Sequence, residues 1–299
     1  MRVGVIGRSQ MLYNSVKAVA DAGYEIAFVA TAKEAPEYTA TAEDFRQLAK
    51  SLDVPFFRRL DLENEDSIRH ASREIDIAIT MNWPRIFTES VTSLFGKGII
   101  NAHGSLLPKY RGNACPNWAI INGETETGFT IHLVEPDALD TGDIVFQKSM
   151  PMTEHTYIGD VYQWLEDEIP AGFCSALNNL NAEGFSPRAQ DEREAIRGYP
   201  RRPEDGRLDF SRAAYDLHRL VRASSYPFEG AYCHFERDVV VRVFRARVVE
   251  LSTVSLCVPG QVLQLENGVP SVATGDGAIQ FEEFEAVHPI HITRRSRFY

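Results

Sequence analysis

The sequence predicts an α/β domain built on a parallel sheet, followed by a smaller domain that is mostly β. Two observations support this fold class. In the first part of the chain, short apolar runs alternate with amphipathic segments of helical period, which is typical of parallel strands joined by helices. After a charged, proline-containing stretch at 185–207, the apolar runs follow one another closely with Gly and Asn between them, which is typical of an antiparallel β domain.

The elements of the first domain follow from these patterns. Strands are predicted at residues 2–7, 25–32, 54–58, 75–81, 98–103, 127–134 and 143–150. Helices are predicted at residues 15–22, 41–52 and 67–74. A longer apolar stripe predicts another helix at 157–183, which Pro170 is expected to kink or break.

The second domain is expected to form a small barrel or sandwich. One helix is predicted at 211–224, and strands are predicted at 231–235, 239–249, 261–265, 271–273 and 278–284. Asn267 and Gly268 predict a tight hairpin turn. We therefore expect domains at 1–186 and 207–299, joined by a linker at 187–206.

Composition narrows the class of protein. The 299 residues are 44% hydrophobic and 24% charged, which is typical of a globular chain. No apolar run reaches the ~18 residues that a membrane span needs, and the amino terminus has no secretory pattern, so we expect a cytoplasmic protein without a membrane partner. The four cysteines lie at least 24 residues apart, which excludes paired metal-ligand spacing and predicts reduced thiols.

Charge is distributed unevenly. The formal net charge is -11, and residues 1–185 hold 15 Lys and Arg against 26 Asp and Glu, whereas residues 186–299 hold 16 of each. An acidic surface repels phosphate backbones, so wide contact with nucleic acid is disfavoured. A local basic cluster at Arg294, Arg295 and Arg297 could still make a smaller contact with nucleic acid.

Two common cofactor motifs are missing from the sequence. Gly4 and Gly7 do not complete the G-x-G-x-x-G pattern of dinucleotide sites, and no G-x-x-x-x-G-K-[ST] occurs. A nicotinamide or ATP enzyme therefore loses its main support, and tight packing explains these glycines.

Polar residues gather where the predicted strand at 98–103 ends. Asn101 and His103 are two residues apart and face the same side of the strand. Asp137, Asp140 and Asp143 lie in a Gly-containing loop, and their spacing of three does not fit a calcium loop. Ligands of open α/β sheets bind beyond the carboxyl ends of the strands, so these groups are candidates for one site.

An amide, an imidazole and a carboxylate at one sheet end favour acyl-type transfer. The amide would stabilise an oxyanion, the histidine would move a proton, and the carboxylate would set the tautomer of the histidine. No G-x-S-x-G occurs and Cys115 follows the loop, so the attacking group is expected to belong to the substrate. The alternative is a structural histidine beside a solvated turn, and spacing alone leaves it open.

Longer motifs resemble a known family. NAHGSLLPKYRG at 101–112, NGETETG at 122–128 and LDTGDIV at 139–145 are similar to the core of the tetrahydrofolate-dependent formyltransferases. That family includes enzymes acting on methionyl-tRNA, glycinamide ribonucleotide and amino sugars. The resemblance implies a Rossmann-like catalytic domain, an OB-like barrel, 10-formyltetrahydrofolate as formyl donor and no metal.

The resemblance also implies roles for individual residues. Its catalytic triad corresponds to Asn101, His103 and Asp140. A deprotonated acceptor amine would attack the formyl carbon, the first two residues would stabilise the oxyanion, and the aspartate would orient the histidine and relay the proton. Folate contacts are implied for Asn82, Trp83, Ile86, Phe87, Asp137 and Asp143. Acceptor contacts are implied for Ser105, Lys109 and Arg111, although the last two would equally serve to brace their loop.

The acceptor is predicted from further resemblance and from charge. The tRNA enzyme carries a basic insertion after the second strand, whereas residues 31–45 here hold one lysine and four acids, which disfavours tRNA. The motifs above and LHRLVRASSYPFEGAY at 217–232 are most similar to the formyltransferase that acts on UDP-4-amino-4-deoxyarabinose and to other nucleotide-sugar N-formyltransferases, so this resemblance implies a nucleotide-linked amino sugar as the small-molecule partner.

Several alternatives remain. The main competing acceptor is a hydroxyornithine-type amine of siderophore synthesis, and the sequence leaves a homodimer open. A folate-binding protein without activity is a further alternative, but it would have little reason to retain Asn101, His103 and Asp140 together.

Overall fold

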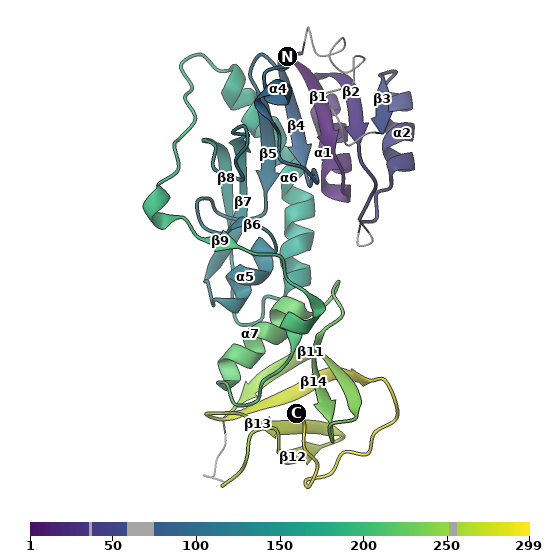
Figure 1. The fold of residues 1–299 in the computed structure, drawn as a ribbon, viewed down its shortest axis with the longest axis vertical. Coiled ribbons are helices and arrows are strands. Elements are labelled where there is room, and N and C mark those ends of the chain that lie inside the picture. The colour runs from purple at the N-terminus through teal and green to yellow at the C-terminus, as the bar shows by residue number, and fades with distance from the viewer. Residues whose placement is uncertain (36–37, 59–74, 251–255) are drawn as a thin grey trace. The chain divides into compact units, whose positions relative to one another are not determined.

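The computed structural model of the protein describes residues 1–35, 38–58, 75–250 and 256–299 (Figure 1). The chain divides into two compact units that each consist of several segments. Unit 1 comprises Met1–Gly112, Thr127–Met150 and Gln163–Gly198, and unit 2 comprises Asn113–Glu126, Pro151–Tyr162 and Tyr199–Tyr299. The boundary predicted at 187–206 stays a prediction, and the helix expected at 67–74 lies outside the described residues.

Unit 1 contains a seven-stranded sheet with the order β3-β2-β1-β4-β5-β7-β8 (Figure 1). The strands are β1 (Arg2–Gly7), β2 (Glu25–Thr31), β3 (Phe56–Arg58), β4 (Ile77–Met81), β5 (Ile99–His103), β7 (Glu126–Leu133) and β8 (Ile144–Pro151). β1 to β5 pair in parallel, which confirms the α/β fold class. β7 runs antiparallel to β5, so the predicted parallel sheet is in fact mixed. The chain leaves β5 at its carboxyl end and re-enters the sheet beside that end, at the pair His103 and Thr130.

Side-chain caps explain where the first helices begin. α1 (Gln10–Asp21) starts earlier than the predicted residue 15, because the hydroxyl of Ser9 accepts a hydrogen bond from the N–H of Leu12. α2 (Ala42–Ser51) begins after Thr41, whose side chain and that of Asp44 form a capping box. Both helices bury an apolar stripe at helical spacing.

The long helix α6 (Ile158–Asn181) contains Pro170 without interruption, so of the kink or break predicted there, the break does not occur. A proline inside a helix removes one hydrogen bond and typically costs ~3 kcal/mol. Leu165, Ile169, Phe173 and Leu177 are buried on both sides of it. Their burial offsets that cost, because each buried side chain of this size contributes about 1.5–3 kcal/mol. The described residues of unit 1 also form the shorter segments α4 (Glu89–Thr92) and η1 (Glu192–Glu194), and α5 (Cys115–Ile121) lies in unit 2.

Unit 2 contains a five-stranded antiparallel sheet with the order β10-β11-β14-β13-β12. Its elements are η2 (Pro203–Gly206), α7 (Ala214–Ser224), β10 (Ala231–Phe235), β11 (Val239–Val249), β12 (Val262–Glu266), β13 (Val269–Ala273) and β14 (Ala278–Ala286). Asn267 and Gly268 both have positive φ and form the predicted turn between β12 and β13. α7 begins after the predicted residue 211, because Ser211 is held in a turn by hydrogen bonds from its N–H and hydroxyl to Asp209.

The C-terminal segment closes this sheet into a barrel. Tyr299 exchanges two backbone hydrogen bonds with His234 at one edge strand, β10. Beside the other edge strand, β12, the N–H of Phe298 donates to Gly260, and the N–H of Val262 donates to Ser296. Phe298 is 1% exposed and lies within the core of unit 2. The two edges are therefore bridged by the same short segment.

Candidate functional site

The predicted amide and imidazole stand at the carboxyl end of β5. Asn101 is half-buried and His103 is buried, and the strand geometry places both on one face of the sheet. The loop after β5 doubles back, so that the carbonyl oxygen of Tyr110 lies 2.8 Å from Nε2 of His103. Because a carbonyl oxygen only accepts, Nε2 is the donor in this contact.

The loop between β7 and β8 brings the predicted carboxylate to the same place. Asp140 is buried, has a φ of 57°, and its Oδ2 accepts a hydrogen bond of 2.9 Å from the N–H of Gly112. A Cβ at Gly142 would overlap with the carbonyl oxygen of Leu133, so the loop needs glycine there. Of the three aspartates predicted in this loop, only Asp140 is buried, because Asp137 and Asp143 are exposed.

The three predicted catalytic residues therefore form one cluster. Nδ1 of His103 lies 3.5 Å from Oδ2 of Asp140. Burial alone would raise the pKa of Asp140, but electrostatic interaction with His103, the neighbouring His132 and the Gly112 N–H together lower that pKa to about 2. Asp140 is thus an ionised carboxylate that faces the imidazole of His103.

His132 is a member of this cluster to which the sequence analysis gave no role. It lies on β7 directly opposite Asn101 on β5 and is 2% exposed. Its Nε2 is 3.1 Å from Nδ2 of Asn101 and 3.5 Å from Oδ1 of Asp140. The available signal was the alternation along the strand, since Thr130 and His132 are polar residues on the same buried face.

Gln190 also supports the site and was missed. Its Nε2 donates to the carbonyl oxygens of Asp140 at 2.9 Å and Gly142 at 2.7 Å. Its Oε1 accepts from Arg111, whose guanidinium also contacts Glu192 at 2.6 Å. Part of the segment predicted as a linker therefore holds the Asp140 loop, and β9 (Arg197–Gly198) pairs with β6 (Arg111–Gly112) beside it. Charge-rich composition gave no indication of this role.

The residues predicted to contact the acceptor occupy different environments. Arg111 is buried in the contacts just described, which favours the bracing role that the sequence left open. The hydroxyl of Ser105 is also used within the loop, because it donates to the carbonyl of Lys109 at 2.7 Å. Lys109 is exposed.

The two segments predicted to hold folate lie side by side. The N–H of Asp137 donates to the carbonyl of Phe87 at 2.9 Å. Phe87 is buried and stacks on Trp83 with ring centroids 6.3 Å apart, so both aromatic rings pack within residues 82–87, which we call the hinge. Ile86 is 54% exposed, and Asn82 has a φ of 55° with its carbonyl accepting from Arg8 Nε at 2.9 Å. Arg8 therefore holds this hinge and is a further residue that the sequence analysis missed.

The described residues offer neither a metal centre nor a membrane span. Within these ranges, no group of three or more His, Cys, Asp and Glu side chains has an arrangement suited to a metal ion. The four cysteines are free. No helix in the described part of the chain is long and apolar enough to cross a membrane.

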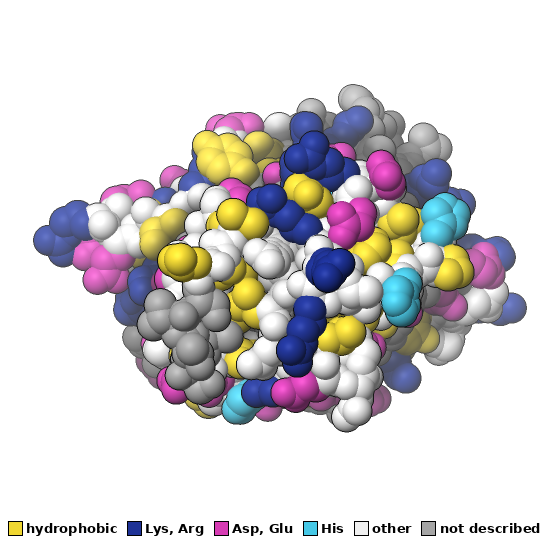
Figure 2. Space-filling model, turned by 90° about the horizontal axis from the view of Figure 1, so that it is seen from below, with side chains coloured by type: hydrophobic (Ala, Val, Ile, Leu, Met, Phe, Trp, Pro, Cys, Tyr) yellow, Lys and Arg dark blue, Asp and Glu magenta, His cyan; other side chains and the backbone are white. Residues whose placement is uncertain are grey.

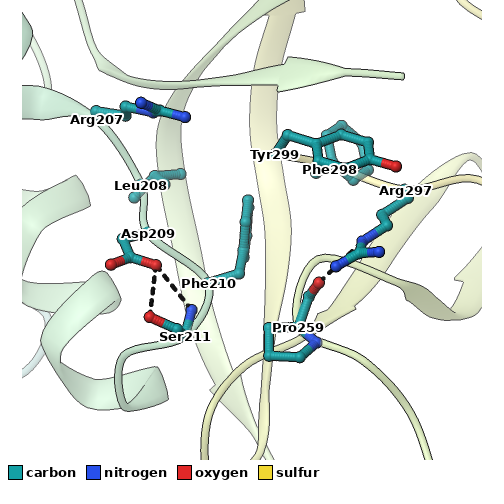
Figure 3. Close-up of a pocket in the computed structure, with 9 residues that line it drawn as sticks. All are labelled: Arg207, Leu208, Asp209, Phe210, Ser211, Pro259, Arg297, Phe298 and Tyr299. Carbon is teal, nitrogen blue, oxygen red and sulfur yellow. Dashed lines mark hydrogen bonds between the residues drawn. The ribbon is translucent and has the colours of Figure 1, made fainter. Parts of the chain in front are cut away.

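A cavity of about 690 Å³ lies in unit 2 (Figure 3). It is lined by Arg207, Leu208, Asp209, Phe210, Ser211, Pro259, Arg297, Phe298 and Tyr299. The Asp209 carboxylate accepts both hydrogen bonds from Ser211, and Nε of Arg297 donates to the carbonyl of Pro259 at 3.2 Å. None of the predicted catalytic or folate-binding residues lines this cavity, so the cavity and the site on unit 1 share no residues.

Comparison with known proteins extends these observations. A family model described as "Formyl transferase" matches residues 1–177, and one described as "Formyl transferase, C-terminal domain" matches residues 201–292. The chain is 32% identical over 291 residues to a methionyl-tRNA formyltransferase of Pelotomaculum thermopropionicum, covering 95% of this chain and 91% of that protein.

Several solved structures have a similar fold. WlaRD, a sugar 3N-formyl transferase, has a TM-score of 0.68 at 15% identity, covering 97% of this chain and 99% of that chain. An N-formyltransferase from Helicobacter canadensis has a TM-score of 0.68 at 16% identity, covering 93% of this chain and 98% of that chain. HypX from Aquifex aeolicus, solved with tetrahydrofolic acid, has a TM-score of 0.64 at 19% identity, covering 95% of this chain but 44% of HypX. This chain therefore spans less than half the length of HypX, and at these identities the likeness concerns the fold.

Proposed function

The chain belongs to the formyl transferase family, and on that basis we propose that it moves a formyl group from 10-formyltetrahydrofolate to the amine of a nucleotide-linked amino sugar. The observation that carries this proposal is the cluster of Asn101, His103 and Asp140 at the carboxyl end of β5. It contains an amide donor, an imidazole and an ionised carboxylate, which are the groups that direct attack by an amine requires.

The proposed reaction begins with attack of the acceptor nitrogen on the formyl carbon. The carbonyl electrons move to oxygen, and the N–H of Asn101 and the positive charge of His103 stabilise this oxyanion. The bond to N10 of the folate then breaks, the leaving nitrogen gains a proton, and the acceptor nitrogen loses one. A pKa of about 2 makes Asp140 a weak base, so the contacts support its orienting role more strongly than its predicted part in the proton relay.

The folate is proposed to bind between residues 82–87 and the 137–143 loop. The hydrogen bond from Asp137 to Phe87 joins these segments and supports one continuous site. Asn82, Ile86, Asp137 and Asp143 are not buried, which supports their predicted contacts with the folate. The packing of Trp83 against Phe87 supports a structural role for that ring.

The proposed acceptor depends on charge at the segment after β2. Glu34, Glu43 and Asp44 are partly or fully accessible there, and they would repel the phosphates of tRNA. A small nucleotide-linked sugar presents fewer phosphates and needs no extended basic surface. Two sugar N-formyltransferases of known structure share this fold over nearly the whole chain, so the fold is one that sugar N-formyltransferases use.

Methionyl-tRNA is the second candidate acceptor, and two observations favour it. The curated relative at 32% identity acts on methionyl-tRNA. Figure 2 shows a face on which several Lys and Arg side chains lie among hydrophobic and uncharged ones, with some Asp, Glu and His side chains beside them. Arg294 and Arg295 are exposed in unit 2 and form part of the basic cluster noted in the sequence.

A thermal-shift panel separates the candidate acceptors. The protein would be heated with a folate analogue and, separately, UDP, dTDP, GDP, hydroxyornithine or tRNA. A ligand at ~100 times its dissociation constant stabilises a protein by ~2.7 kcal/mol, which gives a measurable rise in Tm. We expect a nucleotide to raise Tm, and a rise with hydroxyornithine or tRNA alone would overturn the proposed acceptor.

A further inference from the structure

Only one ring nitrogen of His132, Nε2, is free of a backbone contact that fixes it as a hydrogen-bond donor. Its Nδ1 lies 2.8 Å from the carbonyl oxygen of Leu133. Because that oxygen only accepts, Nδ1 carries a hydrogen in this arrangement. In the neutral ring the other nitrogen, Nε2, carries no hydrogen and accepts one from the cluster, whereas in the protonated ring its hydrogen is directed at the Asp140 carboxylate, 3.5 Å away.

The group that donates to this acceptor is the side chain of Asn101. Its Nδ2 lies 3.1 Å from Nε2 of His132, on the neighbouring strand. The amide nitrogen has two hydrogens, so one is held by His132 and the second is left for another acceptor. The χ2 angle of an asparagine, which turns its amide group, has a broad distribution of allowed values. Without the contact to His132, the amide oxygen and nitrogen could exchange places.

We propose that His132 is a positioning residue that keeps the amide nitrogen of Asn101 directed at the reacting carbonyl. This inference rests on the proposed function, in which Asn101 donates to the oxyanion. An amide turned the other way would present its oxygen to a developing negative charge and would oppose the reaction instead of assisting it. The loss expected is on the order of 10- to 100-fold in kcat, since losing a donor outright typically costs 10²–10³.

Two substitutions of similar polarity test the proposal. Asparagine at this position can still donate to Leu133 near the place of Nδ1, but it is too short to reach Asn101. Glutamine is long enough to place an acceptor near the position of Nε2. We expect His132→Asn to lower kcat by roughly tenfold or more with little change in KM for the formyl donor, and His132→Gln to recover most of that loss.

A double-mutant cycle shows through which partner His132 acts. If His132 works through Asn101, adding His132→Asn to Asn101→Ala lowers kcat no further than Asn101→Ala alone. Losses that multiply would mean that His132 acts independently, for example through Asp140, whose Oδ1 is 3.5 Å away. Independent losses, or equal activity of the asparagine and glutamine variants, would overturn the proposal.

Failure of the proposed function would look different. If Asn101→Ala itself kept wild-type turnover, the oxyanion role of that residue would be wrong, whatever His132 does. Folate binding and the thermal unfolding transition would be measured for each variant. A variant that binds folate with wild-type affinity and unfolds in one wild-type-like transition reports on kcat and not on folding.

Discussion

Replacing Asp140 with asparagine should change how stability depends on pH. The carboxyl has a pKa of about 2 in the folded protein, against a usual value of 3.8. Lowering a pKa by one corresponds to about 1.4 kcal/mol, so the charged carboxylate contributes about 2 kcal/mol to the free energy of unfolding. Because the folded pKa is lowered, this contribution is present above pH 3.8 and is lost as the pH falls toward 2.

The assay is urea unfolding of the wild type and of Asp140→Asn across pH 2–6. The asparagine side chain has no charge to lose, so the difference in unfolding free energy between the two proteins should shrink by about 2 kcal/mol between pH 6 and pH 2. Asp21→Asn, which replaces an exposed carboxylate on α1, controls for the loss of one negative charge. A difference that stays constant over this range would refute the assignment of Asp140 as a carboxylate stabilised by its histidine neighbours.

Three further substitutions test other parts of the structure. Gln190→Ala removes two hydrogen bonds to the Asp140 loop. It should lower kcat/KM about tenfold and reduce the free energy of unfolding in urea by about 1–3 kcal/mol. Wild-type activity would contradict the bracing role of Gln190. Gly142→Ala would force its methyl group into the carbonyl of Leu133, so we expect turnover to fall with little change in the unfolding of unit 2, as measured by paired activity and hydrogen-exchange experiments. Phe298→Ala should cost about 3–5 kcal/mol in calorimetric or urea unfolding, and a cost near that of an exposed-site change would mean that the C-terminal segment does not close the barrel.

Periodic patterns predicted most of the strands because burial alternates or continues over several residues there. β10 (Ala231–Phe235) and β11 (Val239–Val249) begin and end where the sequence predicted. Helix starts were harder to predict, since the start of α1 depends on the hydroxyl of Ser9, which a search for apolar periodicity does not weigh. Of the kink or break predicted at Pro170, the break does not occur for a related reason, because burial on both sides outweighs a local penalty.

In the site, too, contacts between residues close together in the sequence were predicted, whereas contacts between residues far apart in the sequence were not. Asn101 and His103 were predictable because two residues on one strand face the same side. The role of Arg111 was not, because its partners Gln190 and Glu192 lie about 80 residues away in a stretch whose composition is typical of a linker. The role of His132 depends on an antiparallel pairing of β5 and β7 that the predicted parallel sheet did not contain.

Formyl transfer itself is the most direct test of the proposed function. The purified protein would be incubated with 10-formyltetrahydrofolate and a UDP-linked 4-amino sugar, while tetrahydrofolate release and the mass of the sugar are followed. We expect equal amounts of tetrahydrofolate and N-formyl sugar, with turnover at least 100-fold lower in Asn101→Ala and in His103→Ala. Formylation of methionyl-tRNA, with no nucleotide-linked amino sugar accepted, would contradict the proposed acceptor, and wild-type turnover in both variants would contradict the mechanism.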